Sequence, residues 1–435
     1  MSTATLTESV LRAAAPRVYG RVARVVGLNL EIEGLTAPIG SVVALPTAQG
    51  LVTAEVVALR DGGLICMPLG ELVGVEAGAL VTATGRGPTV RVGDSLLGRV
   101  LDGLGRPIDN GPGLAACELV SLSSVAPHPL TRSPIREQLG LGVRAVDTLI
   151  PVGRGQRVGI FSGSGVGKSS ILSMFARGTA APVTVLALIG ERGREVREFI
   201  DNDLGPDGLA RSVVVVSTSD QPALVRLRAA FTATRIAEYF RDQGQDVLLL
   251  MDSLTRFSMA QREVGLSAGE PPATRGYPPS VFSLLPKLLE RAGTSDRGSI
   301  TALYTVLIEG DDLMDPIGDA ARSILDGHIV LSRRLATAGH FPSIDVLESI
   351  SRLTGAITTD DQRASITACR QMLAAYRDTK DLIEIGAYVP GTNPLVDHAI
   401  LLKEPMDGFL RQDMHELTPA SDAWTWLAQL LGGSG

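Results

Sequence analysis

Short alternations of apolar and polar residues fill most of the first 95 residues, with glycine or proline between them. Alternation with a period of two is typical of half-buried β-strands, and several short strands at this spacing indicate a small β-barrel. The clearest alternations are Val22 to Val26, Leu30 to Ile32, Ser41 to Leu45 and Thr53 to Leu59. We therefore expect a β-barrel domain over residues 18–95.

The pattern changes after a stretch rich in glycine and proline, which runs from Gly85 to Gly113 and is typical of loops between domains. Beyond it, runs of Val, Ile and Leu are separated by stretches of helical length. These runs are Arg157 to Phe161, Val183 to Ile189, Val213 to Val216, Val247 to Met251, Ile300 to Leu307 and His328 to Leu331. Buried strands that alternate with helices predict a parallel sheet covered on both faces.

Apolar positions follow helical spacing after residue 358, as at Ile366, Met372, Leu373 and Tyr376. The predicted fold class is therefore α/β, with three domains behind an N-terminal segment at 1–17. We expect a β-barrel at 18–95, an α/β nucleotide-binding domain at 96–358 and a helical domain at 359–435.

The composition is that of a globular protein, with 45% apolar and 20% charged residues in a chain of 435. The formal charge of -7 disfavours nucleic acid as a partner. No apolar run approaches the roughly 20 residues that span a bilayer, and residues 1–17 lack the apolar core of a signal peptide. Three cysteines without disulfide or metal spacing fit a reducing compartment, so we expect a cytoplasmic protein.

Residues 157–170 read RVGIFSGSGVGKSS, an apolar strand that runs into a glycine-rich turn and then a helix-compatible stretch. This order is typical of a P-loop, in which backbone N–H groups surround a phosphate, the lysine reaches the terminal phosphates and the hydroxyl after it binds magnesium. Ser162 replaces the first glycine of the motif. A chance glycine-rich turn is the alternative. The predicted ATP-binding residues are Gly163, Ser164, Gly165, Val166, Gly167, Lys168, Ser169 and Ser170, with Ser169 on Mg²⁺.

Two carboxylates end buried strands at the edge where ligands bind to parallel sheets. Asp252 follows the run Val247 to Met251, where it can hold Mg²⁺ through water; the alternative is a cap for the next turn. Glu191 follows Val183 to Ile189 and can polarise the water that attacks the γ-phosphate. Its alternative is an ion pair with Arg192 or Arg194.

Four longer segments show a family resemblance: GERGREVREF, MDSLTRF, GEPPATRGYPPSVFSLLPKLLERAG and ILDGHIVLSRRL. With them the chain resembles the F1-type catalytic ATPases and, within these, the type III protein-export ATPases. The form SGSGVGKS resembles the flagellar branch more than the virulence-associated one. The resemblance implies a homohexameric ring with nucleotide between neighbouring subunits.

The resemblance also implies roles for single residues. Lys168, Glu191, Arg192 and Arg352 would be catalytic: Glu191 would orient the lytic water, Arg192 would lie near the γ-phosphate, and Arg352 would act as an arginine finger across the subunit interface. For Arg352 the alternative is a surface arginine paired with Glu348.

Three further residues are implied at the nucleotide. Arg256 would face the phosphate site, although it can equally be a solvated helix residue. Phe341, in GHFPSID, would stack on adenine, and its alternative is a core position. Tyr388, in IGAYVPG, would close the pocket from the helical domain.

The implied function is Mg-ATP hydrolysis that drives unfolding and delivery of flagellar export substrates at the inner-membrane export apparatus. Implied partners are export substrates and chaperones, the export gate, a stator-like regulator (FliH-type) and a central stalk protein (FliJ-type). The regulator would bind residues 1–17, where Leu6, Val10, Leu11 and Ala14 share one helix side. The stalk would touch the acidic stretch 309–319.

Four alternatives stay open. One is a virulence-type secretion ATPase, and another is the catalytic subunit of a rotary F/V-type ATPase, which needs a noncatalytic partner chain in its ring. An RNA translocase would need stacking surfaces in its first domain. Residues 1–95 hold a single aromatic, Tyr19, which argues against it. A subunit that binds nucleotide without hydrolysis is disfavoured by Glu191.

Overall fold

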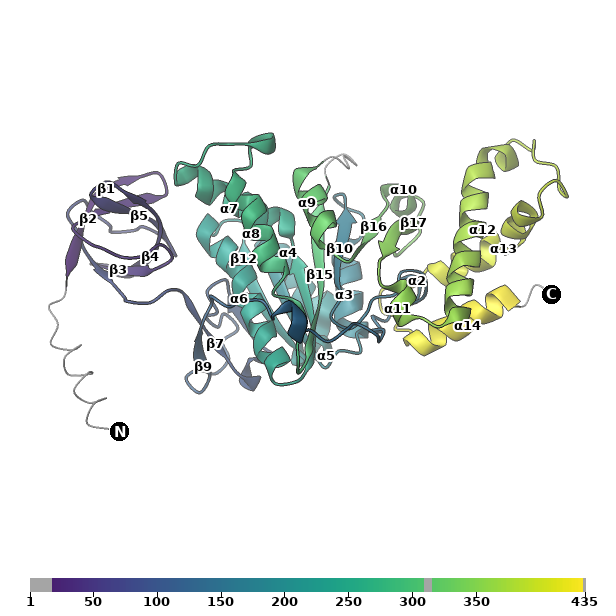
Figure 1. The fold of residues 1–435 in the computed structure, drawn as a ribbon, viewed down its shortest axis with the longest axis horizontal. Helices are drawn as coiled ribbons and strands as arrows, with labels where there is room; N and C mark the ends of the chain where they lie inside the picture. Colours follow the sequence, from purple (N-terminus) through teal and green to yellow (C-terminus); the bar gives the residue numbers. More distant parts are fainter. Residues whose placement is uncertain (1–17, 309–314, 433–435) are drawn as a thin grey trace.

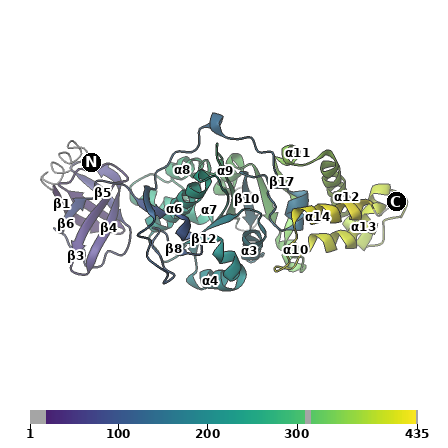
Figure 2. The ribbon, with the colours of Figure 1, turned by 90° about the horizontal axis from the view of Figure 1, so that it is seen from below.

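The computed structural model describes residues 18–308 and 315–432, which form three units in a row (Figure 1). A small barrel lies at one end, a sheet covered by helices in the middle, and a group of helices at the other end. A view turned by 90° shows the same order (Figure 2). The three kinds of domain expected from the sequence are confirmed, whereas the exact boundaries stay predictions.

The first unit is a closed barrel of six strands in the order β1-β2-β5-β4-β3-β6. The expected strands are all present, and β5 and β6 join them. The strands are β1 (Tyr19–Val26), β2 (Asn29–Glu33), β3 (Val42–Thr47), β4 (Gly50–Arg60), β5 (Gly63–Pro68) and β6 (Leu80–Ala83). Alternate residues such as Leu30 and Ile32 point into the barrel, where they are fully buried. Closure leaves no unpaired strand edge.

The central unit is built on a sheet of order β17-β16-β10-β15-β13-β11-β12-β8, with the short β14 (Gly293–Thr294) paired to β15. Neighbours from β16 to β8 are parallel, as predicted, and β17 is an antiparallel edge strand that the sequence analysis missed. The strands are β8 (Val100–Asp102), β10 (Arg157–Ser162), β11 (Val183–Glu191), β12 (Ser212–Thr218), β13 (Asp246–Asp252), β15 (Ser299–Leu307), β16 (Gly327–Leu331) and β17 (Ile344–Ser351). Beside it, β7 (Thr89–Val92) pairs with β9 (Glu118–Ser121).

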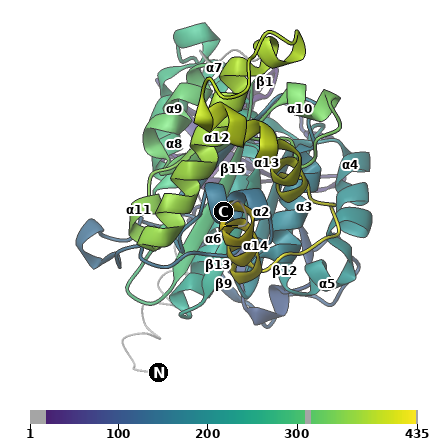
Figure 3. The same ribbon diagram turned by 90° about the vertical axis from the view of Figure 1, so that its right-hand side faces the viewer.

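Helices cover both faces of this sheet, as Figure 3 shows from the side of the C-terminal helices. One face carries α6 (Ala223–Asp242), α7 (Leu254–Ser267), α8 (Pro279–Leu289) and α9 (Pro316–Ile324). The other carries α2 (Arg144–Leu149), α3 (Lys168–Gly178), α4 (Gly193–Glu198) and α5 (Gly205–Ala210). Successive residues of β11 alternate between the two cores: Ala187 and Ile189 belong to the first, Leu186 and Leu188 to the second. Burial on both faces explains why the sequence of this strand is a continuous apolar run.

The last unit holds α12 (Asp360–Glu384), α13 (Pro394–Leu410) and α14 (Ala420–Gly432). Their buried residues, such as Met372, Phe409 and Leu427, belong to the same apolar cluster as α2 and α3, so this unit packs on the α3 side of the sheet. Short elements complete the fold: η1 (Asp94–Leu96), η2 (Pro129–Thr131), η3 (Phe199–Leu204), η4 (Thr274–Gly276), α10 (Arg333–Thr337) and α11 (Thr354–Ile357). No helix in the described ranges is long and apolar enough to cross a bilayer.

Candidate functional site

The predicted P-loop is the turn between β10 and α3, at the carboxyl edge of the sheet. Gly165 and Gly167 adopt φ of 73° and 90°, in the left-handed region where a side chain is disfavoured. Gly167 is also the N-cap of α3, and no side chain caps that helix, so its first N–H groups face the turn without a competing acceptor from a cap. Free N–H groups and the helix dipole together favour an anion at this place.

Lys168 lies between two carboxylates that come from two other strands. Its Nζ is 2.6 Å from Asp252 Oδ1 at the end of β13 and 3.3 Å from Glu191 Oε1 at the end of β11. Burial alone would lower the pKa of Lys168, but the charges of Asp252 and Glu191 raise it above its ordinary value, so the side chain stays an ammonium. The three residues expected at the phosphates are thus brought together.

Glu191 does not form the ion pair that was its alternative role. Arg192 pairs instead with Glu195 at 3.6 Å, and Arg194 turns outward to Glu198. Burial raises the pKa of the Glu191 carboxyl, and the charge of Asp252 raises it further against the opposing charge of Lys168. A carboxylate that holds its proton more tightly than usual suits a group that must accept one from water. The side chain of Arg192 is 81% exposed in this chain.

Asp252 is buried and is not a cap for the next turn. That role belongs to Ser253, whose hydroxyl accepts a hydrogen bond from Arg256 N at 3.2 Å and caps α7. The carboxylate of Asp252 instead accepts hydrogen bonds from Lys168 and, at 2.7 Å, from the hydroxyl of Thr305 on β15. The sequence analysis missed Thr305, although a hydroxyl within an apolar strand is a signal of such a contact.

Arg256 is not a solvated helix residue. Its aliphatic stem lies against Gly190, where a Cβ on that glycine would stand 3.2 Å from Arg256 Cβ and Cγ. Its Nε is buried and without a partner in the described residues, and its charge lowers the pKa of Glu191. An unsatisfied buried donor next to Glu191 is consistent with a ligand that supplies an acceptor there.

Phe341 lies over the end of the P-loop rather than in the core. A Cβ on Gly167 would be 3.6 Å from two ring carbons of Phe341, and the side chain is 47% exposed. The half-exposed ring therefore offers a flat apolar surface beside the first turn of α3. This position is compatible with the predicted stacking on adenine, which stays a prediction.

The last two predicted residues lie away from this P-loop. Arg352 follows the edge strand β17, is exposed and donates to the carbonyl of Arg322 at 3.2 Å. Glu348, its alternative partner, pairs with Arg377 at 3.1 Å. Tyr388 lies between α12 and α13, where its hydroxyl donates to Asp397 at 2.9 Å and to Asn393 O at 3.1 Å. The role of Tyr388 at the pocket stays a prediction.

The site offers few metal ligands of its own. Among the residues that the structure describes, no group of three or more His, Cys, Asp or Glu side chains is arranged to hold a metal ion. Asp252 and the exposed Ser169 supply two oxygen donors at the P-loop, beside the Glu191 carboxylate that Lys168 contacts. One carboxylate and one hydroxyl fit Mg²⁺ that is held jointly with substrate phosphates.

The site combines a P-loop lysine with two carboxylates at strand ends. It lies in a parallel sheet between a barrel and a helical unit, and this combination is that of a P-loop ATPase of the F1 type. Residues 142–351 match the ATP synthase alpha/beta family, nucleotide-binding domain, and residues 358–429 match the T3SS EscN ATPase C-terminal domain. The chain belongs to the family of flagellum-specific ATP synthases and type III secretion system ATPases.

Close relatives cover nearly the whole chain. It is 48% identical to a flagellum-specific ATP synthase of Bacillus subtilis over 99% of both chains, and 51% identical to one of Salmonella typhimurium over 94% of this chain and 92% of the relative. A type 3 secretion system ATPase of Xanthomonas euvesicatoria is 49% identical, over 95% and 94%. The structure of the assembled ATPase EscN from enteropathogenic E. coli superposes with a TM-score of 0.90 at 45% identity, covering 95% of this chain and all of that one.

Proposed function

We propose that this chain is the Mg-ATP hydrolase of a flagellar protein export apparatus and works as a homohexameric ring. The observation that carries the proposal is the position of Lys168 between Glu191 and Asp252 at the P-loop. Identity reaches 51% with flagellum-specific relatives and 49% with a type 3 secretion system ATPase, and this small difference favours the flagellar assignment.

The geometry supports a division of labour for hydrolysis. On ATP binding, the Lys168 ammonium moves from the two carboxylates to the β- and γ-phosphate oxygens, which are the stronger anion. Glu191 is then free to orient a water for attack on the γ-phosphate and to accept its proton. Ser169 and Asp252 would hold Mg²⁺, which would supply charge neutralisation at the phosphates. Arg256 stands beside Glu191 as a second positive charge at this edge.

The ring would complete the site from a neighbouring subunit. Arg352 is exposed at the outer edge of the sheet and forms no ion pair with Glu348, so it is available to reach a neighbour's γ-phosphate. The proposal also places Arg192 near the γ-phosphate, and Phe341 and Tyr388 at the adenine base. One solved relative is described as assembled EscN in complex with its central stalk EscO. By analogy, a central stalk protein (FliJ-type) would occupy the centre of this ring.

The remaining partners follow from the same assignment. A stator-like regulator (FliH-type) would bind residues 1–17, which lie outside the described residues, as do residues 309–314 of the acidic stretch expected to meet the stalk. Export substrates, their chaperones and an export gate would be met at the cytoplasmic side of the inner membrane, where the ring would associate peripherally.

Two experiments test the assignment. Expressed alone, the chain should hydrolyse ATP in the presence of Mg²⁺ and lose turnover with excess EDTA; a requirement for a second, noncatalytic chain would favour the rotary-ATPase alternative. In the native host, replacement by the Lys168→Ala variant at equal protein level should abolish flagellar filaments. Normal filaments together with a lost virulence-secretion phenotype would contradict the flagellar role.

A further inference from the structure

The backbone of Phe341 is tied to the helical unit by one residue. The main-chain N–H of Gln412 donates to the carbonyl of Phe341 at 3.0 Å. Gln412 lies just beyond α13, which ends at Leu410, so this hydrogen bond joins the segment over the P-loop to the far end of a helix from the last unit.

The side chain of Gln412 fixes where that N–H stands. It is 5% exposed, and its Oε1 accepts a hydrogen bond from Arg144 N at 2.9 Å. Its Nε2 donates to Gly142 O at 2.8 Å and to Glu416 O at 2.9 Å, so both amide hydrogens are used. Arg144 is the first residue of α2, in the core of the nucleotide-binding unit, and Gly142 lies two residues before it. The buried amide therefore fixes the position of Gln412 relative to the central unit.

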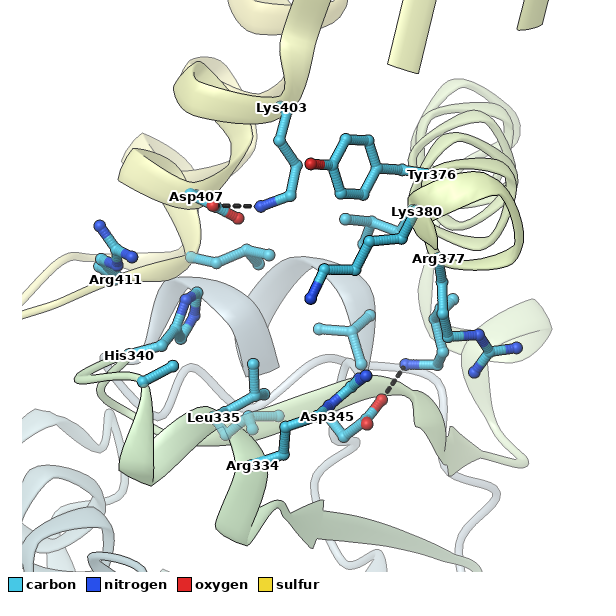
Figure 4. Close-up of a pocket in the computed structure, with 16 residues that line it drawn as sticks. Arg334, Leu335, His340, Asp345, Tyr376, Arg377, Lys380, Lys403, Asp407 and Arg411 are labelled. Atoms are coloured by element: carbon cyan, nitrogen blue, oxygen red, sulfur yellow. Dashed lines mark hydrogen bonds and ion pairs between the residues drawn. The ribbon is translucent and has the colours of Figure 1, made fainter. Parts of the chain in front are cut away.

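Packing next to this connection is incomplete on one side. A cavity of about 290 Å³ separates β17 and α10 from α12 and α13 (Figure 4). His340 and Arg411 line it, and they are the sequence neighbours of the two residues that share the hydrogen bond. Atoms next to an open volume lack van der Waals partners on that side. On this side the segment lacks packing partners, and hydrogen bonds hold it elsewhere: the bond from Gln412 N to Phe341 O and a second from Ser343 Oγ to Val166 O of the P-loop at 2.6 Å.

The same segment is also tied to the helix that carries the P-loop. Arg177, in the last turn of α3, donates to the carbonyl of Met414 and lies 3.1 Å from His415 Nδ1. Residues 411–416 thus contact both the segment that holds Phe341 and the helix that begins at Lys168. A displacement of Gln412 would change the place of the Phe341 ring relative to the P-loop.

We propose that Gln412 is a positioning residue for the nucleotide base, because its buried amide sets where Phe341 stands over the P-loop. The inference rests on the proposed function, since it takes Phe341 as the surface on which the base stacks. Gln412 itself touches no phosphate-binding residue of the P-loop in the described contacts. Its contribution should therefore appear for ligands that carry a base and disappear for ligands that do not.

The test is a double-mutant cycle read with two ligands, Mg-ADP and inorganic pyrophosphate, by calorimetry on the full chain. Phe341→Ala should weaken Mg-ADP by roughly 5- to 150-fold, the range expected for loss of one stacked base, and leave pyrophosphate unchanged. Gln412→Ala should weaken Mg-ADP by about 5-fold, also without effect on pyrophosphate. In the double variant, Gln412→Ala should add nothing to the loss from Phe341→Ala.

Two further variants control for general damage to the interface. Trp424→Phe removes the hydrogen bond from its Nε1 to Gln138 Oε1 (3.1 Å), which joins the same two units without contact to Phe341 or Gln412. It should leave both affinities unchanged. Gln412→Met keeps the volume of the side chain and removes its three hydrogen bonds. It therefore tests the positioning role of Gln412 if the alanine variant does not fold.

The possible results separate the two ideas. If Phe341→Ala leaves the affinity for Mg-ADP unchanged, the stacking role in the proposed function is wrong. If Phe341→Ala weakens Mg-ADP as expected but the effect of Gln412→Ala is additive to it, or equal for pyrophosphate, the positioning role of Gln412 alone is overturned.

Discussion

Replacement of Glu191 by glutamine should separate catalysis from stability at this site. The amide keeps the shape of the side chain and can still accept a hydrogen bond from Lys168, but it cannot take a proton from water. Lys168 keeps its closer partner, Asp252, at 2.6 Å. We therefore expect the variant to bind ATP and assemble like the wild type while losing most of its turnover.

The size of each effect follows from the geometry. Loss of a general base typically lowers a rate by about 10²- to 10⁴-fold, which is roughly 3 to 5 kcal/mol in the activation barrier. The attraction of Glu191 to Lys168 at 3.3 Å is about 5 kcal/mol at an effective dielectric of ~20, before desolvation. Because the pKa of Glu191 is nevertheless raised, burial and Asp252 outweigh this attraction. The free energy of unfolding should therefore change by less than about 1 kcal/mol, with stabilisation favoured.

The sign of the pH dependence provides an independent check. Between the ordinary and the raised pKa of Glu191, the folded protein binds more protons than the unfolded chain, so this carboxyl lowers stability as pH rises. The Glu191→Gln variant lacks that contribution. The melting temperature of the variant minus that of the wild type should therefore increase as pH is raised from 4.5 towards 7. A decrease of this difference over the same range would contradict the electrostatic argument.

Turnover is measured by phosphate release at saturating Mg-ATP, and stability by thermal unfolding. The matched control is Glu195→Gln, which neutralises an exposed carboxylate on α4 that pairs with Arg192 rather than Lys168. It should leave the free energy of unfolding and the ion pairs of Lys168 unchanged. A Glu191→Gln turnover within about twofold of wild type would show that Glu191 is only a member of a structural ion pair.

Three further predictions concern the P-loop, the subunit interface and the acidic stretch. Lys168→Ala should abolish turnover and weaken nucleotide binding in a titration, because it removes the cation at the phosphates and leaves two buried carboxylates unpaired; unchanged turnover would refute the P-loop assignment. Arg352→Ala and Lys168→Ala chains, each inactive, should regain phosphate release on mixing, since a finger in trans can supply ~10³- to 10⁵-fold in rate; mixed rings that stay inactive would contradict it. Charge reversal at Asp319, whose side chain is 60% exposed, should leave basal turnover unchanged but remove stimulation by a stalk partner. In the wild type this stimulation should weaken as salt is raised. Asp315 should be changed only to Asn in this assay, because its side chain accepts a hydrogen bond from Gly318 N and caps α9.

Sequence patterns predicted the central strands because parallel strands buried on both faces must be continuously apolar. The edge strand β17 was missed, although Ile344 and Val346 are buried and alternate with more exposed residues. An edge strand with one covered face has the weaker period-two pattern, and polar residues at Asp345, Glu348 and Ser349 interrupt the apolar run. In the barrel, β5 was missed because five successive buried residues give it no alternation, and β6 because it has only four residues.

The P-loop and both carboxylates could be predicted because each follows a recognisable strand. Their mutual contact could not be measured from the sequence, since it depends on β10, β11 and β13 ending at one edge of the sheet. The stem of Arg256 against Gly190 and the amide of Gln412 have no local signal at all. Such contacts join residues far apart in the chain, and only the packing of the units brings them together.

The most direct test of the central claim is the native mass of the purified chain, measured with and without Mg-ATP alongside its turnover at the same concentrations. The chain of 45.6 kDa should form six-copy rings, and specific activity should rise in proportion to the fraction of chains in rings. Full specific activity at concentrations where only monomers are present would contradict the account, because no single chain holds both its own P-loop and a neighbour's Arg352.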